Sequence, residues 1–278
     1  MQKGIKFRIY PNREQQNLIN QTLGCCRLIY NKGLAMRNEA YENGNKIGYS
    51  QTSSMLTELK KCEDFAFLKV VDSIALQQSL RDLDRGFVNF FQKRAAHPTF
   101  KSKHNRHQSY RTVNQKDNIR IVGNYIKLPK LGYVKIRQSM EVGKINNVTI
   151  EHTTTGRYFA VLNVEFKPQP RPNNGGRIGI DVGIKEFYSD SNGNVVSNPK
   201  FLEQSMRKLI REQRRLSRKQ KGSNNRNKQR VKVALVHEKI TNQRNDFLQK
   251  QSTMLICENQ TICLSLIHIS EPTRPEPI

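Results

Sequence analysis

The chain has 278 residues, of which 36% are apolar, so it is long enough to form one large core or two ordinary ones. Its formal net charge of +25 would make the chain repel itself without a polyanionic partner, and nucleic acid is the partner that we expect. No apolar run approaches the roughly 18 residues of a spanning helix, so no membrane partner is expected. Five cysteines without Cys-x-x-Cys spacing and an N-terminus unlike a signal peptide favour a reducing, cytosolic compartment.

The first part of the chain combines one predicted strand with a run of predicted helices. Ile5, Phe7 and Ile9 alternate with Lys and Arg, which predicts an N-terminal strand. From residue 11 to about residue 91 the apolar residues recur at helical spacing. The segment that begins at Ser73 gathers its apolar residues on one face, as an amphipathic helix does.

The segment after about residue 97 predicts short strands. It opens with a basic tract that contains aromatic residues, FKSKHNRHQSYR, which is typical of a loop or an edge strand. Two alternating runs follow, at residues 118–137 and 146–166, and glycines interrupt them. This pattern is typical of a small antiparallel barrel or sandwich. If the N-terminal strand joins these strands, the helices are an insertion in a β module.

A linker separates this region from a second predicted domain. Residues 167–176 hold three prolines and two glycines, which mark a domain boundary. Residues 177–197 predict three strands, with an Asn-Gly hairpin signal at Asn192. Two basic helices are predicted over residues 201–221 and 228–258, and they can pair as a hairpin around the polar turn between them.

The strand RIGIDVG, which starts at Arg177, carries the candidate for chemistry. Its apolar residues, up to Val182, are predicted to face one way, while Gly179, Asp181 and Gly183 face the other. A carboxylate flanked by bare backbone leaves room for a hydrated divalent ion and a phosphodiester, and Mg²⁺ prefers such hard oxygen ligands. The alternative is an ordinary aspartate at the end of a strand, with glycines that only mark a bulge.

Two basic tracts are candidates for nucleic-acid contact. About a dozen lysines and arginines lie between Arg207 and Lys232 with few acids among them, so a phosphate backbone is a better counterion than neighbouring side chains. In the tract from Phe100 to Arg111, aromatic residues can stack on unpaired bases while cations hold phosphates. The alternatives are a solvated helix face for the first tract and a flexible surface loop for the second.

Several segments together resemble one known family. They are KFRIYPNREQQNLINQTLGCCRLIYNKGLAMRNEAY, SIALQQSLRDLDRGFVNFF, PTFKSKHNRHQSYRT, GRIGIDVGIKEFYSDSNG and HEKITNQRNDFLQKQST. In this order they resemble TnpB, also called OrfB, of bacterial insertion sequences, a family of RNA-guided DNA nucleases related to type V CRISPR effectors. The resemblance runs from residue 1 to about residue 263.

The resemblance implies an α+β multidomain fold. A wedge-like β-barrel would be interrupted by an inserted helical recognition module and followed by a partial RuvC-like α/β domain of the RNase H fold. The implied bounds are 1–10 and 97–168 for the β module, 11–96 for the helical module, 169–176 for the linker, and 177–263 for the nuclease domain with its basic helical hairpin.

The resemblance also implies a function and a set of site residues. Family members bind a guide RNA copied from the transposon end, pair it with target double-stranded DNA and cut with Mg²⁺, so sequence recognition is delegated to base pairing. Asp181 corresponds to the first catalytic carboxylate and would ligate Mg²⁺. Helix packing or capping is the alternative for several of the implied nucleic-acid contacts. These contacts are Arg27, Tyr30, Asn31, Gln77, Arg81, Lys101, Tyr110, Arg111 and Asn114.

The C-terminal segment departs from the family pattern. The second catalytic carboxylate is expected directly after a strand similar to TICL, at residues 261–264, but Ser265 stands there. From about Leu264 the tail resembles a translated sequencing-library adapter, so residues 264–278 are predicted to be non-native and the chain to be truncated. The second and third carboxylates and the family's zinc ribbon would then be missing.

We therefore predict a chain that binds RNA but does not cut DNA, in the prokaryotic cytoplasm and associated with the nucleoid. One carboxylate cannot hold the paired ions, roughly 4 Å apart, that in-line cleavage uses. Two other functions stay open. They are a non-catalytic guide-RNA and DNA-binding protein, such as a decayed copy or a repressor, and a transposase accessory protein.

Overall fold

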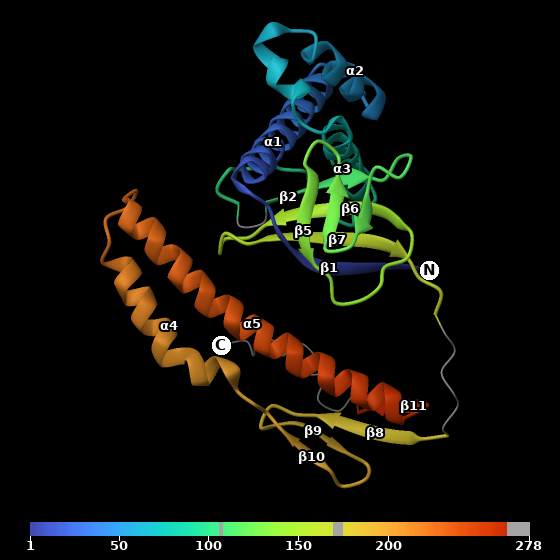
Figure 1. Ribbon diagram of the computed structural model, residues 1–278, viewed down its shortest axis with the longest axis vertical. Coiled ribbons are helices and arrows are strands. Elements are labelled where there is room, and N and C mark those ends of the chain that lie inside the picture. Colours follow the sequence, from blue (N-terminus) through green and yellow to red (C-terminus); the bar gives the residue numbers. More distant parts are fainter. Residues whose placement is uncertain (106–107, 169–174, 266–278) are drawn as a thin grey trace, which may run out of the picture. The chain divides into compact units, whose positions relative to one another are not determined.

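The computed structural model describes residues 1–105, 108–168 and 175–265. The chain divides into two compact units, Met1–Pro168 and Gln169–Ile278 (Figure 1). Each unit has its own sheet and its own apolar core. Most of the predicted linker and of the predicted non-native tail lies outside the described residues.

The frame of unit 1 is a seven-stranded antiparallel sheet in the order β2-β6-β7-β1-β5-β4-β3 (Figure 1). Strand β1 lies inside this sheet, paired with β7 on one side and with β5 on the other. A strand from before the helices thus joins strands from after them, so the helices are an insertion between β1 and β2. The strands are β1 (Gln2–Tyr10), β2 (Gln108–Val113), β3 (Arg120–Val122), β4 (Tyr125–Leu128), β5 (Gly132–Arg137), β6 (Ile145–His152) and β7 (Tyr158–Glu165).

This sheet curls around the main apolar core. Alternation along each strand sends every second side chain into the core, and in β1 these are Phe7 and Ile9. Ile126 of β4 and Leu162 of β7, from the two halves of the sheet, belong to the same core cluster. The strand order ends at β2 and β3, so the sheet is a curled half-barrel and matches the expected barrel only in part.

Three α-helices and one short 3-10 helix form the insertion. They are α1 (Arg13–Glu42), α2 (Tyr49–Leu59), η1 (Glu63–Lys69) and α3 (Ser73–Phe91). Helix α1 begins where Asn12 and Gln15 cap each other, because each side chain accepts a hydrogen bond from the other residue's N–H, at 2.8 and 3.0 Å. Ile19 of α1 and Leu76 of α3 enter the same core as the sheet. The predicted amphipathic helix from Ser73 is confirmed.

Within residues 175–265, unit 2 has four strands and two long helices. Strands β8, β9 and β10 are antiparallel neighbours, and β11 returns parallel to β8 after the helices, so the order is β10-β9-β8-β11. Ile178, Ile180 and Tyr188 form the core of this sheet, and Leu255 of α5 packs against them. The elements are β8 (Arg177–Val182), β9 (Glu186–Asp190), β10 (Val195–Ser197), α4 (Phe201–Ser217), α5 (Asn224–Glu258) and β11 (Thr261–Leu264).

The turn between β9 and β10 follows the Asn-Gly signal. The Asp190 carboxylate accepts hydrogen bonds from the N–H groups of Asn192 and Asn194, at 2.9 and 2.8 Å. Gly193 has a φ of +84°, which favours glycine. The predicted hairpin turn is therefore confirmed.

Helices α4 and α5 pair as the predicted hairpin, through an apolar cluster that includes Leu209 and Val236. Helix α5 begins at Asn224, earlier than predicted, because the Ser223 hydroxyl accepts a hydrogen bond from the Arg226 N–H at 3.1 Å and caps the helix. Among the helices that the structure describes, none has the length and apolar character needed to cross a bilayer.

Candidate nucleic-acid interface

A groove of about 730 Å³ lies between α3 and β2 in unit 1. One wall presents Gln77, Arg81 and Arg85, which follow one another at four-residue spacing along the exposed face of α3. The other wall includes Arg111 of β2 and Gln115, which follows that strand. Amide groups can donate to and accept from base edges, and guanidinium groups bind guanine or phosphate. The groove thus has the chemistry of a nucleic-acid contact surface.

Neighbouring side chains hold the two central arginines of this groove in place. The Arg81 guanidinium carbon lies 4.9 Å from the centroid of the Tyr49 ring. Arg111 donates from Nη2 to Asp82 Oδ1 at 2.5 Å. The Nε–H of Arg111 is buried and has no hydrogen-bond partner among the residues that the structure describes. Because a guanidinium carries five donors, Arg111 keeps donors for a further acceptor.

Asp72 joins the two walls of the groove. Its buried carboxylate accepts a hydrogen bond from the Ile74 N–H at 2.9 Å, which caps α3, and another from the Thr112 hydroxyl of β2 at 2.5 Å. A second bond ties α3 to α1, since the Ser79 hydroxyl donates to the Cys26 carbonyl at 2.7 Å. The bond between Asp72 and Thr112 thus holds α3 against β2, and the bond between Ser79 and Cys26 holds α3 against α1.

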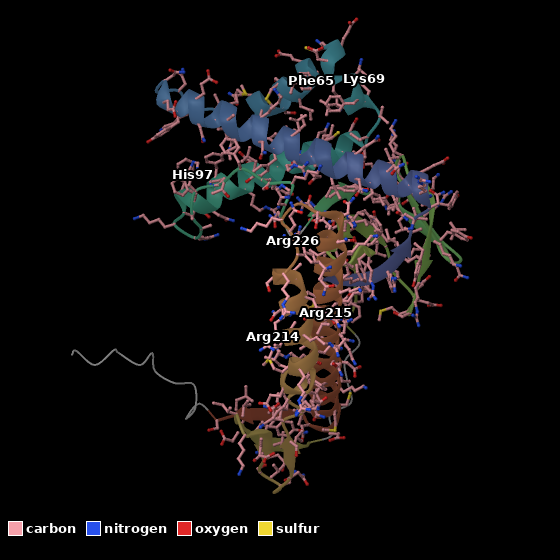
Figure 2. All side chains as sticks on the ribbon, turned by 90° about the vertical axis from the view of Figure 1, so that its left-hand side faces the viewer. Phe65, Lys69, His97, Arg214, Arg215 and Arg226 are labelled. Atoms are coloured by element: carbon pink, nitrogen blue, oxygen red, sulfur yellow. The ribbon has the colours of Figure 1, made fainter. Side chains whose placement is uncertain are left out.

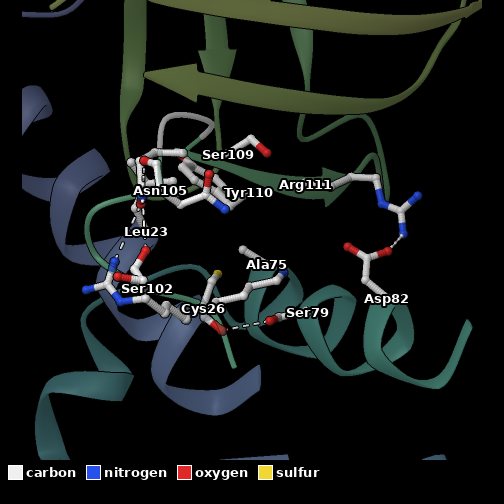
Figure 3. A pocket seen from close by; sticks show the side chains of 13 residues that line it. Leu23, Cys26, Ala75, Ser79, Asp82, Ser102, Asn105, Ser109, Tyr110 and Arg111 are labelled. Carbon is white, nitrogen blue, oxygen red and sulfur yellow. Dashed lines mark hydrogen bonds and ion pairs between the residues drawn. The ribbon is translucent and has the colours of Figure 1, made fainter. Parts of the chain in front are cut away.

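A second hollow, of about 100 Å³, lies between α1, α3 and β2 (Figure 3). Arg27 reaches across it and donates to Gln108 Oε1 at 3.5 Å, and the Lys101 ammonium lies 4.0 Å from the centroid of the Tyr30 ring. Desolvation lowers the pKa of Lys101, while the Asp82 carboxylate opposes this shift. The hollow is far smaller than the α3–β2 groove, so Arg27 and Lys101 can meet a nucleic acid only at its mouth.

Four of the predicted nucleic-acid contacts have structural roles. Tyr30 packs in an apolar cluster with Leu34, and Tyr110 is buried in the main core, where desolvation raises its pKa. The Asn31 side chain bonds both the N–H and the carbonyl of Lys101, at 2.8 and 3.0 Å. These contacts favour the packing alternative for such residues.

The Asn114 side chain also has a structural role. Its amide nitrogen donates to the carbonyls of Ile119 and Ile145, at 3.1 and 2.9 Å, and its oxygen accepts from the Ile119 N–H at 3.0 Å. All of these partners are main-chain groups, so the side chain stabilises the turn after β2. The predicted contacts that line the two hollows with accessible polar groups are Arg27, Gln77, Arg81, Lys101 and Arg111.

Asp181 lies on the exposed side of β8. Ile178 and Ile180 are buried, at 7% and 4% exposure, whereas Asp181 is exposed, so the predicted alternation is confirmed at these three positions. Val182 is 51% exposed, because it is the last residue of β8 and lies outside the apolar cluster that covers Ile178 and Ile180. That Val182 faces the same way as these two residues stays a prediction.

The fold gives a local reason for one of the two glycines beside Asp181. A Cβ added at Gly183 would lie 3.1 Å from the Glu186 carbonyl oxygen, which is a close approach within the turn to β9. A Cβ at Gly179 would make only an ordinary contact with Ser191, at 3.5 Å, so this contact does not require glycine. The exposure of Asp181 is the observation that bears on metal binding.

Position 265 lies next to Asp181 in the sheet. Leu264 pairs with Ile180 in parallel register, and the Ser265 N–H donates to the Ile180 carbonyl at 2.9 Å. Continued by one residue, this register puts Ser265 beside Asp181 on the same side of the sheet. Within residues 1–105, 108–168 and 175–265, no group of three or more His, Cys, Asp or Glu could hold a metal ion. Asp181 supplies one hard oxygen ligand, so the described residues do not fit a complete Mg²⁺ site.

The basic tract between Arg207 and Lys232 lies on the hairpin of α4 and α5. Figure 2 shows Arg214, Arg215 and Arg226 on this hairpin. Glu212 is the acid of this tract, and it is buried at 6% exposure, where it accepts a hydrogen bond from Gln229 at 2.7 Å. That bond, with the charges of nearby arginines, holds the pKa of Glu212 below its usual value despite the opposing effect of burial.

Lysines and arginines from both helices line a groove of about 380 Å³ on the hairpin. Lys208 and Arg215 come from α4, and Lys232 and Lys239 come from α5. Four cations from two helices, with Glu212 already paired, form a surface suited to a phosphate backbone.

Sequence reasoning missed several residues of the α3–β2 groove. Arg85 could have been found, because it continues the four-residue spacing of Gln77 and Arg81. Tyr49 and Asn147 carried no signal, since they come from α2 and β6 and reach the groove only through tertiary folding.

The chain is similar to proteins of one family. A family model for OrfB described as "Probable transposase" matches residues 148–275, and a model described as "Helix-turn-helix domain" matches residues 1–46. In this structure residues 1–46 hold β1 and the single helix α1.

Two relatives match almost the whole chain. A protein of Streptomyces pristinaespiralis named "Putative RNA-guided DNA endonuclease" is 39% identical over 269 residues, which are 95% of this chain and 66% of the relative. A protein of Escherichia coli K12 named "Putative RNA-guided DNA endonuclease InsQ" is 34% identical over 278 residues, which are 98% of this chain and 68% of the relative. The chain therefore spans about two thirds of the length of these relatives.

Solved structures are similar in fold. One of them is the Cas12f1-sgRNA-target DNA complex, in which the matched chain gives a TM-score of 0.53 at 11% identity. The similarity covers 95% of this chain and 81% of that chain.

Low pH should destabilise the α4–α5 hairpin, because Glu212 becomes protonated. Because the folded pKa lies below the usual 4.5, the ionised carboxylate stabilises the fold above about pH 4.5, and this stabilisation is lost as pH falls through the folded pKa. Glu212→Gln should lower the melting temperature relative to wild type near neutral pH, and the gap should shrink in acid. Circular dichroism melts across this range measure it, with Glu203→Gln, an exposed acid on α4, as the control. A gap that does not change with pH contradicts the assignment.

Proposed function

The chain belongs to the OrfB family of probable transposases, and from this membership we propose that it binds a guide RNA copied from a transposon end together with a target DNA duplex. The observation that carries the proposal is the α3–β2 groove, where amide and guanidinium groups from two walls converge. Pairing between guide and target would supply most of the sequence recognition, while the protein holds backbone and shape.

The residues of unit 1 would make different kinds of contact with DNA. Gln77 and Arg81 stand on the exposed face of α3, where they can reach base edges of a duplex in the groove. Arg85 and Arg111 would bind phosphates. Arg111 is already oriented by its hydrogen bond to Asp82, and its buried Nε–H has no partner among the described residues. Arg27 and Lys101 would hold backbone at the mouth of the smaller hollow.

The cationic hairpin of unit 2 would hold RNA. Its grooved surface combines cations from α4 and α5 and carries little opposing charge, which suits the even charge density of an RNA backbone. Such contacts recognise no sequence by themselves. We propose that they retain the guide while unit 1 engages the target, in the prokaryotic cytoplasm at nucleoid DNA.

We further propose that unit 2 is the start of a RuvC-like domain. Three antiparallel strands followed by helices and a parallel strand beside the first support this, as does the exposed carboxylate of Asp181 near the end of that first strand. Asp181 would be one ligand of a divalent-metal site in an endonuclease of this family. Because serine stands beside it at position 265, we propose that the chain does not cut DNA by itself.

A second candidate function is non-catalytic binding. A protein that binds guide and target without cutting would act as a repressor at sites matched by its guide. The two cation-lined grooves favour this function over a transposase accessory role, because they suit a guide and its target. Ser265 lies in the predicted non-native tail and does not bear on this choice.

Copurification tests the proposed function. The chain, co-expressed with the end of its transposon, should retain one discrete RNA through a wash at high salt, because many phosphate contacts and a shaped fit act together. Sequencing the retained RNA identifies it. Recovery of mixed cellular RNA that washes off with salt would overturn guide binding.

Gln77→Ala should weaken recognition of the duplex. Loss of an amide that bonds a base edge costs about 1–3 kcal/mol of discrimination at one base pair. Selection from a randomised duplex library by the RNA-loaded chain should therefore show reduced preference at one position. Gln21→Ala removes an exposed amide from α1 and is the matched control. An unchanged preference profile would rule out base contact by Gln77.

Ser265→Glu should create a metal site with Asp181. Two carboxylates on adjacent positions of parallel strands offer the hard oxygen ligands that Mg²⁺ and Mn²⁺ prefer. Electron paramagnetic resonance should detect Mn²⁺ bound to this variant more tightly than to wild type, and adding Asp181→Ala should remove the gain. Asp246→Ala, at an exposed acid on α5, should leave it intact. Equal Mn²⁺ binding with and without Asp181 would exclude it as a ligand.

A further inference from the structure

A pocket of about 440 Å³ lies where α1 and α3 end together in unit 1. Tyr41 comes from α1, and Phe87, Phe90 and Phe91 come from α3. His97, which follows α3, is labelled in Figure 2. Its size is within the range of small-molecule sites, roughly 300–1,000 Å³. The contacts proposed above do not use this pocket.

The aromatic rings of the pocket present open faces. Phe87 and Phe91 lie nearly parallel, with centroids 6.2 Å apart, and His97 meets Phe87 edge-on at 5.3 Å. Phe87 is buried, yet Phe91 is 70% exposed and Tyr41 is 76% exposed. Large aromatic side chains this exposed at the rim of a pocket indicate a binding surface.

Arg37 gives this pocket a buried cationic side chain with a hydrogen-bond donor that no described residue uses. Its side chain is buried, with the guanidinium carbon 4.6 Å from the centroid of the Phe87 ring and an ion pair to Asp84. The Nε–H of Arg37 is buried and has no hydrogen-bond partner among the described residues. A buried donor without a partner is costly, so the expected ligand carries a hydrogen-bond acceptor as well as a flat apolar face.

The surroundings of the pocket connect it to the α3–β2 groove. Asp84, the ion-pair partner of Arg37, also lines that groove, so pocket and groove flank the same stretch of α3. Lys46 and one acid, Glu42, line the pocket, and the exposed cations Lys93 and Arg94 come two and three residues after the end of α3. A polyanion in the groove can therefore continue past the pocket with its charge balanced.

We propose that this pocket takes one unpaired nucleobase of the nucleic acid held by the α3–β2 groove. A nucleobase has two flat faces for the exposed rings, acceptor atoms for the Arg37 Nε–H, and flanking phosphates for the cations. The inference rests on the proposed function, because it needs a nucleic acid in the groove. A peptide side chain would fit the rings but would leave the donor and the cations without partners.

A fluorescent base tests the pocket directly. A short single-stranded oligothymidine DNA with one central 2-aminopurine, titrated into the full chain, should lose fluorescence as the modified base stacks. Tyr41→Ala and Phe91→Ala should each weaken binding roughly tenfold, and Phe91→Leu should do the same, because leucine keeps apolar bulk but offers no aromatic face. Tyr133→Ala removes an exposed aromatic from β5 and is the matched control. Circular dichroism confirms that each variant is folded.

Three results would overturn the inference. Phe91→Leu binding as tightly as wild type would exclude stacking. A change of sedimentation from dimer to monomer in Phe91→Ala, with unchanged quenching, would assign the rings to a protein contact. Copurified guide RNA without any quenching in wild type would defeat the pocket alone, whereas failure to retain any RNA would defeat the proposed function as well.

Discussion

The buried carboxylate of Asp72 is the interaction on which the candidate interface depends. One oxygen caps α3 and the other accepts the Thr112 hydroxyl of β2, so a single side chain sets the helix against the sheet. A buried carboxylate is tolerated only when its lone pairs are satisfied, which makes this arrangement demanding of both partners. The walls of the groove are the outer faces of these two elements. Its width therefore follows from a bond in the core.

Electrostatics imposes the second constraint, because a chain with a net charge of +25 must place its cations where a polyanion can reach them. Both units meet this demand in the same way. Apolar residues face inward and arginines or lysines face outward, while the acids nearest to them are already paired, as Asp82 is with Arg111 and Glu212 is with Arg215. These paired acids orient the neighbouring cations, and because acids are few, the surface keeps a positive electrostatic potential.

Local patterns predicted the strands of β1 and β8, the helix from Ser73, the β9–β10 turn and the exposed side of Asp181, because periodicity and turn chemistry act over a few residues. Contacts between distant segments were not predictable in this way. The Asn31 side chain forms hydrogen bonds with the main chain of Lys101, 70 residues further along the sequence. This predicted nucleic-acid contact therefore holds two distant segments of the chain together. Tyr49 joined the groove for the same reason. Val182 is exposed because it lies outside the apolar cluster that covers Ile178 and Ile180.

The central claim is that the α3–β2 groove holds target DNA while the cationic hairpin holds RNA. Ultraviolet crosslinking of the RNA-loaded chain to a target duplex, followed by mass spectrometry of the crosslinked peptides, tests it most directly. The account predicts that DNA-linked peptides come from residues 73–91 and 108–115, and that RNA-linked peptides include residues 201–258. Crosslinks from DNA confined to residues 201–258, with none at α3 or β2, would contradict it.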